Sequence, residues 1–173
     1  MNQCSHGSRR ERGFSLLELA VVAVVLSVVM AVLLNRLAFY QEAAERAHFE
    51  TTLRMYKTAL QIRLAELIVE RREGEARTLE VENPTLWLSE KPTNYAGEYP
   101  RQPEPGHWYF DHQTRELVYV ANSASGLVLT GGNGLKQLRF RVKILYQTIN
   151  AGSQQIRGIG GVSITPSAAY QWW

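Results

Sequence analysis

The chain starts polar and basic and then turns apolar. Leu19 to Leu34 contains no charged side chain, and counting back through Glu18 to Phe14 extends the run to twenty-one residues. At about 1.5 Å per residue, a helix of that length spans roughly 31 Å, close to the hydrocarbon thickness of a bilayer. The pattern therefore predicts a transmembrane helix over residues 14–35.

A secretory signal peptide is the alternative interpretation of this run. Its apolar region usually covers about 7–15 residues and ends at a small-residue cleavage site. Here the run is longer and continues through Asn35 and Arg36 into helix-like sequence. Three arginines stand in residues 9–12, and because positive flanks stay cytoplasmic, we expect residues 36–173 on the outer side of the membrane.

Beyond this segment the hydrophobic pattern becomes that of an amphipathic helix. Apolar side chains recur at spacings of three and four residues: Leu53, Tyr56, Leu60, Leu64 and Leu67. No proline or glycine interrupts residues 35–72, so we expect the helix to continue through residues 36–73. Glu42 and Arg46 form an i,i+4 pair that favours this helix, and Gly74 is a suitable C′ residue at its end.

Residues 75–106 break both periodicities. They contain five of the six prolines and predict an irregular but ordered connection between the helix and the strands. Trp87, Tyr95 and Tyr99 are expected to attach this connection to the domain, since disordered segments are poor in aromatic residues.

Strand patterns follow. Residues 107–111 and 116–122 flank a four-residue turn and predict a hairpin, and residues 131–134 predict another turn. Residues 136–147 alternate, and we expect their apolar face to pack on the stripe of the helix. That face consists of Leu138, Phe140, Val142, Ile144 and Tyr146.

These elements predict an α+β fold. Residues 160–165 add a last strand, which Pro166 ends. One long helix, membrane-spanning in its first half and amphipathic in its second, then packs against a small antiparallel sheet. The globular domain comprises residues 36–173.

Composition changes this picture little. The chain carries 19 Lys and Arg against 16 Asp and Glu, a net charge of +3. Because residues 1–13 hold three arginines and one glutamate, the remainder is nearly neutral, and the basic balance does not by itself indicate a nucleic-acid partner. Cys4 is the only cysteine, which excludes an intramolecular disulfide.

Candidate catalytic and metal-binding residues are scarce. His6, His48, His107 and His112 stand at no metal-ligand spacing, and no serine has the context of an activated nucleophile. No acidic residue follows Glu116, so we expect no calcium site made of several carboxylates in the C-terminal part. We expect neither an enzyme nor a cofactor or metal.

Glu18 needs a separate explanation. A carboxylate in hydrocarbon costs several kcal/mol, by order of magnitude, unless it finds a partner. One interpretation is that Glu18 reaches the membrane interface from near the end of the segment. The other is that it pairs with a new amino group, which cleavage after Gly13 creates on Phe14.

Residues 9–40 resemble the N-terminal segment of type IV prepilins and type II secretion pseudopilins. The shared features are a basic leader, a glycine, a phenylalanine, a glutamate five residues after the glycine, and an apolar helix; here the three residues are Gly13, Phe14 and Glu18. The resemblance implies that prepilin peptidase removes residues 1–13, that Phe14 is N-methylated, and that the fold is a pilin-like lollipop.

The resemblance also implies partners and a location. The precursor lies in the bacterial inner membrane with its N-terminus cytoplasmic and its C-terminal domain periplasmic. An inner-membrane assembly platform then adds it to other pilin or pseudopilin subunits, in a pilus (fimbrium) or a periplasmic filament, where Glu18 pairs with the amine of a neighbour. Major pilins usually have a proline near the end of the apolar run. Here Asn35 stands there and the first proline is Pro84, which favours a minor pilin or a pseudopilin.

Two surface features leave alternatives open. Arg139, Arg141 and Lys143 form a basic strand face, which is either an ordinary wet face or a contact for an acidic subunit or nucleic acid. The alternative function is a membrane-anchored, pilin-like binding module that captures DNA or another ligand without building a filament. The tail with Trp172 and Trp173 either packs on the sheet or forms an exposed contact surface.

Overall fold

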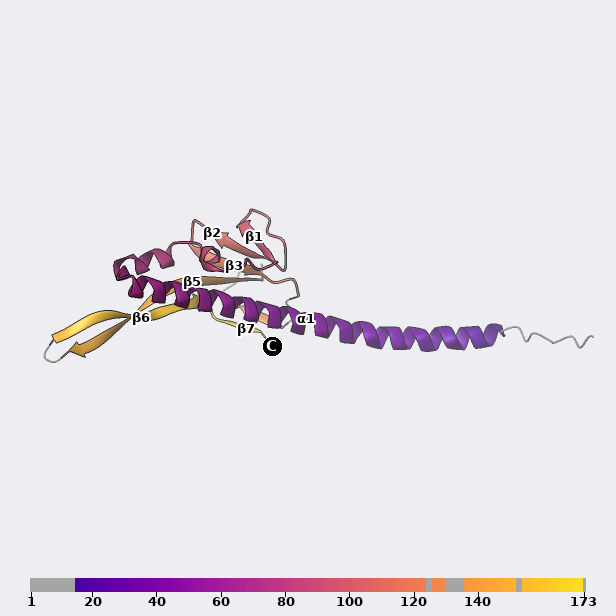
Figure 1. The fold of residues 1–173 in the computed structure, drawn as a ribbon. Helices are drawn as coiled ribbons and strands as arrows, with labels where there is room; N and C mark the ends of the chain where they lie inside the picture. Colours follow the sequence, from indigo (N-terminus) through magenta and orange to yellow (C-terminus); the bar gives the residue numbers. More distant parts are fainter. Residues whose placement is uncertain (1–14, 124–125, 130–135, 152–153, 173) are drawn as a thin grey trace, which may run out of the picture. The chain divides into compact units, whose positions relative to one another are not determined.

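The computed structural model describes residues 15–123, 126–129, 136–151 and 154–172. The chain divides into two units, Met1–Tyr40 and Gln41–Trp173. The helix α1, Leu16–Val69, begins in the first unit and ends in the second, and no glycine or proline interrupts its sequence. The sheets belong to the second unit, and their strands run in colour from pink through orange to yellow in Figure 1.

The second unit contains a five-stranded sheet in the order β1-β2-β3-β5-β6. Its strands are Tyr95–Glu98 (β1), Trp108–Asp111 (β2), Glu116–Val120 (β3), Gln137–Ala151 (β5) and Gln154–Pro166 (β6). In this sheet β2, β3, β5 and β6 pair antiparallel with their neighbours. They correspond to the four strands expected from the sequence and confirm the α+β class. A separate antiparallel pair joins β4, Leu127–Leu129, to β7, Tyr170–Trp172.

The expected apolar stripe of α1 packs on this sheet. Its members from Tyr56 to Leu67 are buried, and Leu53 is partly buried. These helix residues belong to two hydrophobic clusters of the core. Four residues of β5 pack in the same clusters: Leu138, Phe140, Val142 and Ile144. The prediction is wrong for Tyr146, which is 39% exposed, because β5 continues past the end of the stripe.

An aromatic cluster fills the core beside the first turns of α1 in this unit. Phe49 stacks on Trp108 with ring centroids 5.4 Å apart, and Trp172 lies at the same distance from Phe49. Such pairs contribute about 0.5–1.5 kcal/mol beyond the burial of their area. The tail therefore packs inward as far as Trp172, while Trp173 lies outside the described residues.

α1 ends before Gly74. The N–H of Arg72 donates to the Leu67 carbonyl at 2.8 Å and the N–H of Arg71 to the Ile68 carbonyl at 3.1 Å, the two bonds of a Schellman motif. Arg71 occupies the left-handed position of this motif, with a φ of 58°. The prediction that Gly74 is the C′ residue is therefore wrong.

The proline-rich connection is more regular than the sequence predicts. It contains two 3₁₀ helices, η1 (Glu73–Glu80) and η2 (Pro84–Trp87), and the strand β1. β1 pairs parallel with β2, so the sheet is not purely antiparallel. The four residues of β1 contain a glycine and a glutamate, which are uncommon in strands, so the sequence does not predict this strand.

Three aromatic residues attach this connection to the rest of the unit, as expected. Tyr95 packs against the core cluster that contains Phe49 and Trp108. The ring of Trp87 lies 4.4 Å from the guanidinium of Arg63 on α1, and Tyr99 packs edge-on against a tyrosine of β2.

β5 and β6 form the longest strand pair and project beyond the rest of the sheet (Figure 1). Both strands are longer than the sequence predicts. Residues 148–159 lack the alternation that a buried face imposes, so the pattern did not identify them as strand. The register shifts after Leu145 and leaves Gly160 opposite no partner residue, which is a β-bulge. The turn expected at residues 131–134 lies outside the described residues.

Arg71→Gly should stabilise the second unit. A residue with a Cβ is strained at a φ of 58°, and glycine removes about 1 kcal/mol of that strain. We expect the melting temperature to rise by roughly 2–4 °C in thermal unfolding followed by circular dichroism. Arg71→Ala is the matched control, since it removes the same charge and keeps the Cβ; an equal rise in both variants would contradict the assignment.

Candidate functional site

In the first unit, α1 presents its apolar side chains outward. All residues from 15 to 37 are exposed; Leu26, for example, is 62% exposed and Leu34 is 58% exposed. Exposed apolar area costs about 25 cal/mol per Å² in water, so this surface needs lipid or other helices around it. Among the described residues, α1 is the one helix long and apolar enough to cross a membrane.

Glu18 lies in the first turn of α1 and its side chain is exposed. No described residue forms an ion pair with it, and Gly13 and Phe14 lie outside the described residues. A carboxylate in the first turn interacts favourably with the helix dipole, which offsets only part of its cost in an apolar environment. Of the three site residues expected from the sequence, the described part of α1 therefore holds Glu18, which is its one charged residue before Arg36.

A second site lies on α1 in the other unit, where two carboxylates hold the segment after β3. Glu45 accepts hydrogen bonds from the Tyr119 hydroxyl at 2.8 Å and from the backbone N–H groups of Asn122 and Ser123, both at 2.7 Å. Glu42 accepts the N–H of Gly126 at 2.7 Å. We call this group the glutamate clamp.

The glutamate clamp corrects one prediction from the sequence. Glu42 does not pair with Arg46; Arg46 instead forms an ion pair with Glu50 at 3.1 Å. The clamp was not recognised in the sequence because its partners are mostly backbone amides, which leave no residue pattern. Burial, together with the hydrogen bond to Glu45, raises the pKa of Tyr119, so this hydroxyl stays protonated and acts as the donor.

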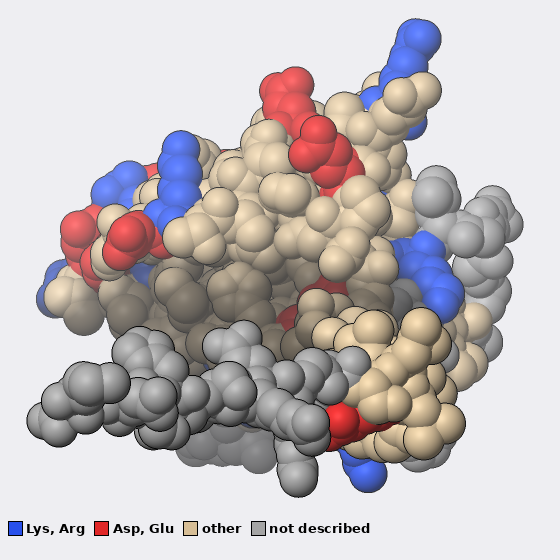
Figure 2. Space-filling model, turned by 90° about the vertical axis from the view of Figure 1, so that its right-hand side faces the viewer, with Lys and Arg blue, Asp and Glu red and all other residues tan. Residues whose placement is uncertain are grey.

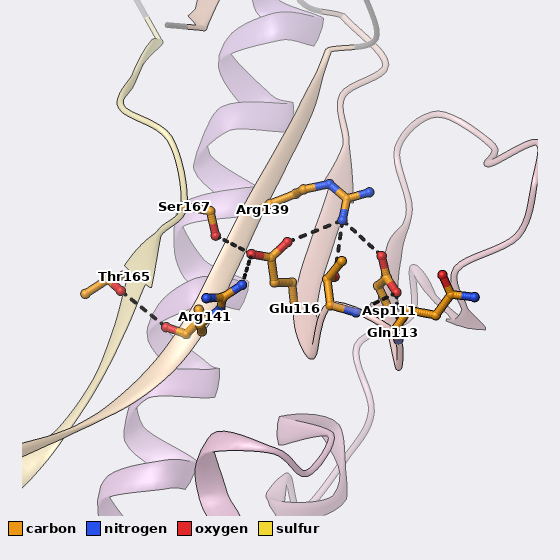
Figure 3. A network of polar contacts seen from close by, with 8 residues as sticks. Asp111, Gln113, Glu116, Arg139, Arg141, Thr165 and Ser167 are labelled. Carbon is orange, nitrogen blue, oxygen red and sulfur yellow. Dashed lines mark hydrogen bonds and ion pairs between the residues drawn. The ribbon is translucent and has the colours of Figure 1, made fainter. Parts of the chain in front are cut away.

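Two of the three basic residues of the strand face, Arg139 and Arg141, are paired with carboxylates (Figure 3). Arg139 donates to Asp111 at 3.0 Å and to Glu116 at 3.3 Å, and Arg141 donates to Glu116 at 3.0 Å. Glu116 is 5% exposed and also accepts the Ser167 hydroxyl at 2.7 Å. On the face drawn in Figure 2, acidic and basic side chains of the described residues are interspersed. This arrangement does not favour the DNA-binding alternative, which needs a continuous basic patch.

Within the described ranges, no three His, Cys, Asp or Glu residues are placed to hold a metal ion. The Nδ1–H of His107 donates to the Pro105 carbonyl at 2.9 Å, and His112 lies 3.4 Å from Glu98 on the surface. Asp111 closes the turn after β2 through the N–H groups of the next residues. These histidines serve the local structure of the hairpin.

Comparison with known proteins gives one match. Residues 8–34 match the family model of the prokaryotic N-terminal methylation motif, the prepilin signal of type IV pilins and pseudopilins. No curated protein and no solved structure matches the chain significantly. The matched segment covers the basic stretch, Gly13, Phe14, Glu18 and the apolar part of α1 up to Leu34. The chain therefore carries the N-terminal motif of pilin-type precursors, and this motif includes the first part of a helix that is long and apolar enough to cross a membrane.

Glu45→Ala should weaken the second unit by about 2 kcal/mol. It leaves the Tyr119 hydroxyl and two backbone N–H groups without their acceptor, and water replaces only part of that interaction. Urea unfolding measures the loss, and hydrogen exchange should become faster at Asn122 and Ser123. Glu50→Ala is the control, because its exposed ion pairs contribute less than about 1 kcal/mol. Equal losses in the two variants would argue against the clamp.

Asp111→Asn should remove part of the acid sensitivity of folding. Burial raises the pKa of Asp111, but hydrogen bonds from Arg139 and the turn amides outweigh it, so the pKa lies below its ordinary value of 3.8. The stabilisation is complete above the unfolded-state pKa and is lost as the pH falls through the lower folded-state pKa. The free energy of unfolding should therefore differ between wild type and variant at pH 7, and the difference should shrink below about pH 4. A difference that persists at low pH would refute this account.

Proposed function

We propose that the chain is a minor pilin or pseudopilin, a structural subunit of a bacterial type IV pilus or a type II secretion-type filament. The observation that carries this proposal is the methylation motif at residues 8–34, in which the exposed surface of α1 carries no charge from Leu19 to Leu34. A structural subunit acts by assembly, and its chemistry is limited to processing of its own N-terminus.

The first step is membrane insertion of the precursor. The arginines of residues 9–12 hold the N-terminus on the cytoplasmic side, and the apolar part of α1 anchors the chain in the inner membrane. The second unit then lies in the periplasm.

The second step is cleavage by prepilin peptidase between Gly13 and Phe14. It removes residues 1–13 and frees an amino group on Phe14, which is then methylated. Methylation keeps the positive charge of the amine, so it remains a partner for a carboxylate.

The third step is docking into the filament through the assembly platform. Glu18 of an incoming subunit pairs with the Phe14 amine of its neighbour, among the exposed apolar side chains of several α1 helices. An unpaired carboxylate there costs several kcal/mol, by order of magnitude, and the pairing removes that cost only in one axial register. The buried ion pair thus acts mainly on specificity of docking.

The absence of proline favours a minor subunit. The sequence has no proline between Phe14 and Asn83, whereas major pilins usually have one near the end of the apolar run. α1 is accordingly unbroken from Leu16 to Val69.

The test is the mature N-terminus together with the fate of Glu18→Ala. Mass spectrometry of wild-type protein from membranes and sheared filaments should find a chain that starts at methylated Phe14. Glu18→Ala should still insert and be cleaved, but its incorporation should fall at least tenfold, the effect of losing about 1.4 kcal/mol or more of docking energy.

Glu66→Ala is the matched control, an exposed carboxylate on the same helix that pairs only at the surface. It should be incorporated normally. An intact Met1 start would refute processing, and normal incorporation of Glu18→Ala would refute the pairing.

A further inference from the structure

The outer edge of β6 lies open beside a groove. β6 is the last strand of the five-stranded sheet, and in the described part of the chain it pairs with β5 alone. Between this edge and α1 runs a groove of about 500 Å³, lined by Leu64, Ala65 and Ile68 of the helix and by residues 159–163 of the strand. A free edge next to an apolar groove is where extended segments of other proteins bind.

The hydrogen-bond pattern identifies the free backbone groups. The N–H of Ile144 donates to the Glu80 carboxylate at 2.8 Å, on the side of β5 away from β6. Ile144 is directly opposite Val162, and in an antiparallel pair both such residues turn their N–H groups away from each other. The N–H and C=O groups of Val162 therefore point to the open edge, and by alternation so do those of Ile164, opposite Val142.

The groove fits a strand of defined length. Lys57 and Ile68 mark its extent along α1, eleven residues apart in the sequence, which corresponds to about 17 Å of helix. The same distance holds about five residues of extended chain. Gly161 lines the groove and a Cβ added there would meet nothing within 4 Å, so another backbone can approach the edge closely at this residue.

Charge and apolar side chains define the occupant. Lys57 lines one end of the groove and forms no ion pair with a described residue. Along the rest, Leu64 and Val162 are buried, whereas Ile68 is 40% and Leu145 51% exposed, so apolar contact area remains uncovered. An acidic residue followed by alternating apolar side chains complements this lining.

We propose that the edge of β6 binds an extended segment of a partner protein, about five residues long, with alternating apolar side chains and a carboxylate that pairs with Lys57. The segment adds a sixth strand to the sheet. Its main chain pairs with Val162 and Ile164, and every second side chain enters the groove over Ala65. This interaction is separate from the N-terminal helix and does not rest on filament assembly.

The test uses the full chain in detergent micelles and two capped six-residue peptides. Both alternate valine and threonine in the middle; one has glutamate at both ends and the other lysine. We expect the glutamate peptide to bind wild type at least tenfold more tightly than the lysine peptide. Hydrogen exchange should slow at the amides of Val162 and Ile164 when it is bound.

Two variants locate the binding. Lys57→Glu should reverse the preference between the peptides, and Ala65→Trp, which fills the groove from an exposed position, should weaken binding at least tenfold. Ala47→Trp is the control, an exposed alanine of α1 outside the groove, and should bind as wild type. Circular dichroism establishes that each variant is folded.

Several outcomes would overturn the proposal. These are no binding of either peptide to wild type at millimolar concentration, binding without slower exchange at the two edge amides, or the same loss in Ala47→Trp as in Ala65→Trp. Failure here leaves the processing of the N-terminus untouched, so it is distinguishable from failure of the proposed function.

Discussion

The burial of one stripe of α1 against the sheet is the interaction on which the second unit depends. From Phe49 to Leu67 the helix supplies one side of both large core clusters, and β5 is the strand that contributes to both, with two buried residues in each. Because the stripe belongs to a helix that continues without a break from Leu16, the folded unit and the apolar segment are parts of one secondary-structure element. The apolar segment has no such partner within the described chain, and all of residues 15–37 are exposed. One helix therefore meets two requirements: an internal core for its second part and an external apolar environment for its first.

Polar side chains on the same helix and sheet fix the position of segments that the apolar stripe does not hold. Burial of apolar area is not directional, so it does not determine where the segment after β3 lies. The glutamate clamp does so through backbone amides, and the network around Glu116 ties the β2–β3 turn to β5 and to Ser167 after β6. These contacts satisfy polar groups that would otherwise be buried without partners.

The sequence predicts those parts of the structure in which burial produces a regular pattern of apolar residues. The apolar run, the stripe of α1 and the alternation in β5 were all read from periodicity, and the methylation motif was recognised from Gly13, Phe14 and Glu18. What could not be predicted lacks such a trace. β1 is too short and too polar, Arg71 takes a position that usually belongs to glycine, and the clamp uses backbone donors. Tyr146 continues the alternation beyond the end of the helix stripe and is 39% exposed, with its hydroxyl accepting a hydrogen bond from Arg77.

The hydrogen bond between Glu80 and Ile144 has a consequence for strand alignment. The bond fixes from outside the sheet which side of β5 carries this amide, because η1 supplies the acceptor. Val142, Ile144 and Val162 are buried in one core cluster at the same place, so a shift of one residue would turn apolar side chains out of the core. Glu80 therefore reinforces the alignment that the core selects, at the point where β5 and β6 continue as a two-stranded ribbon.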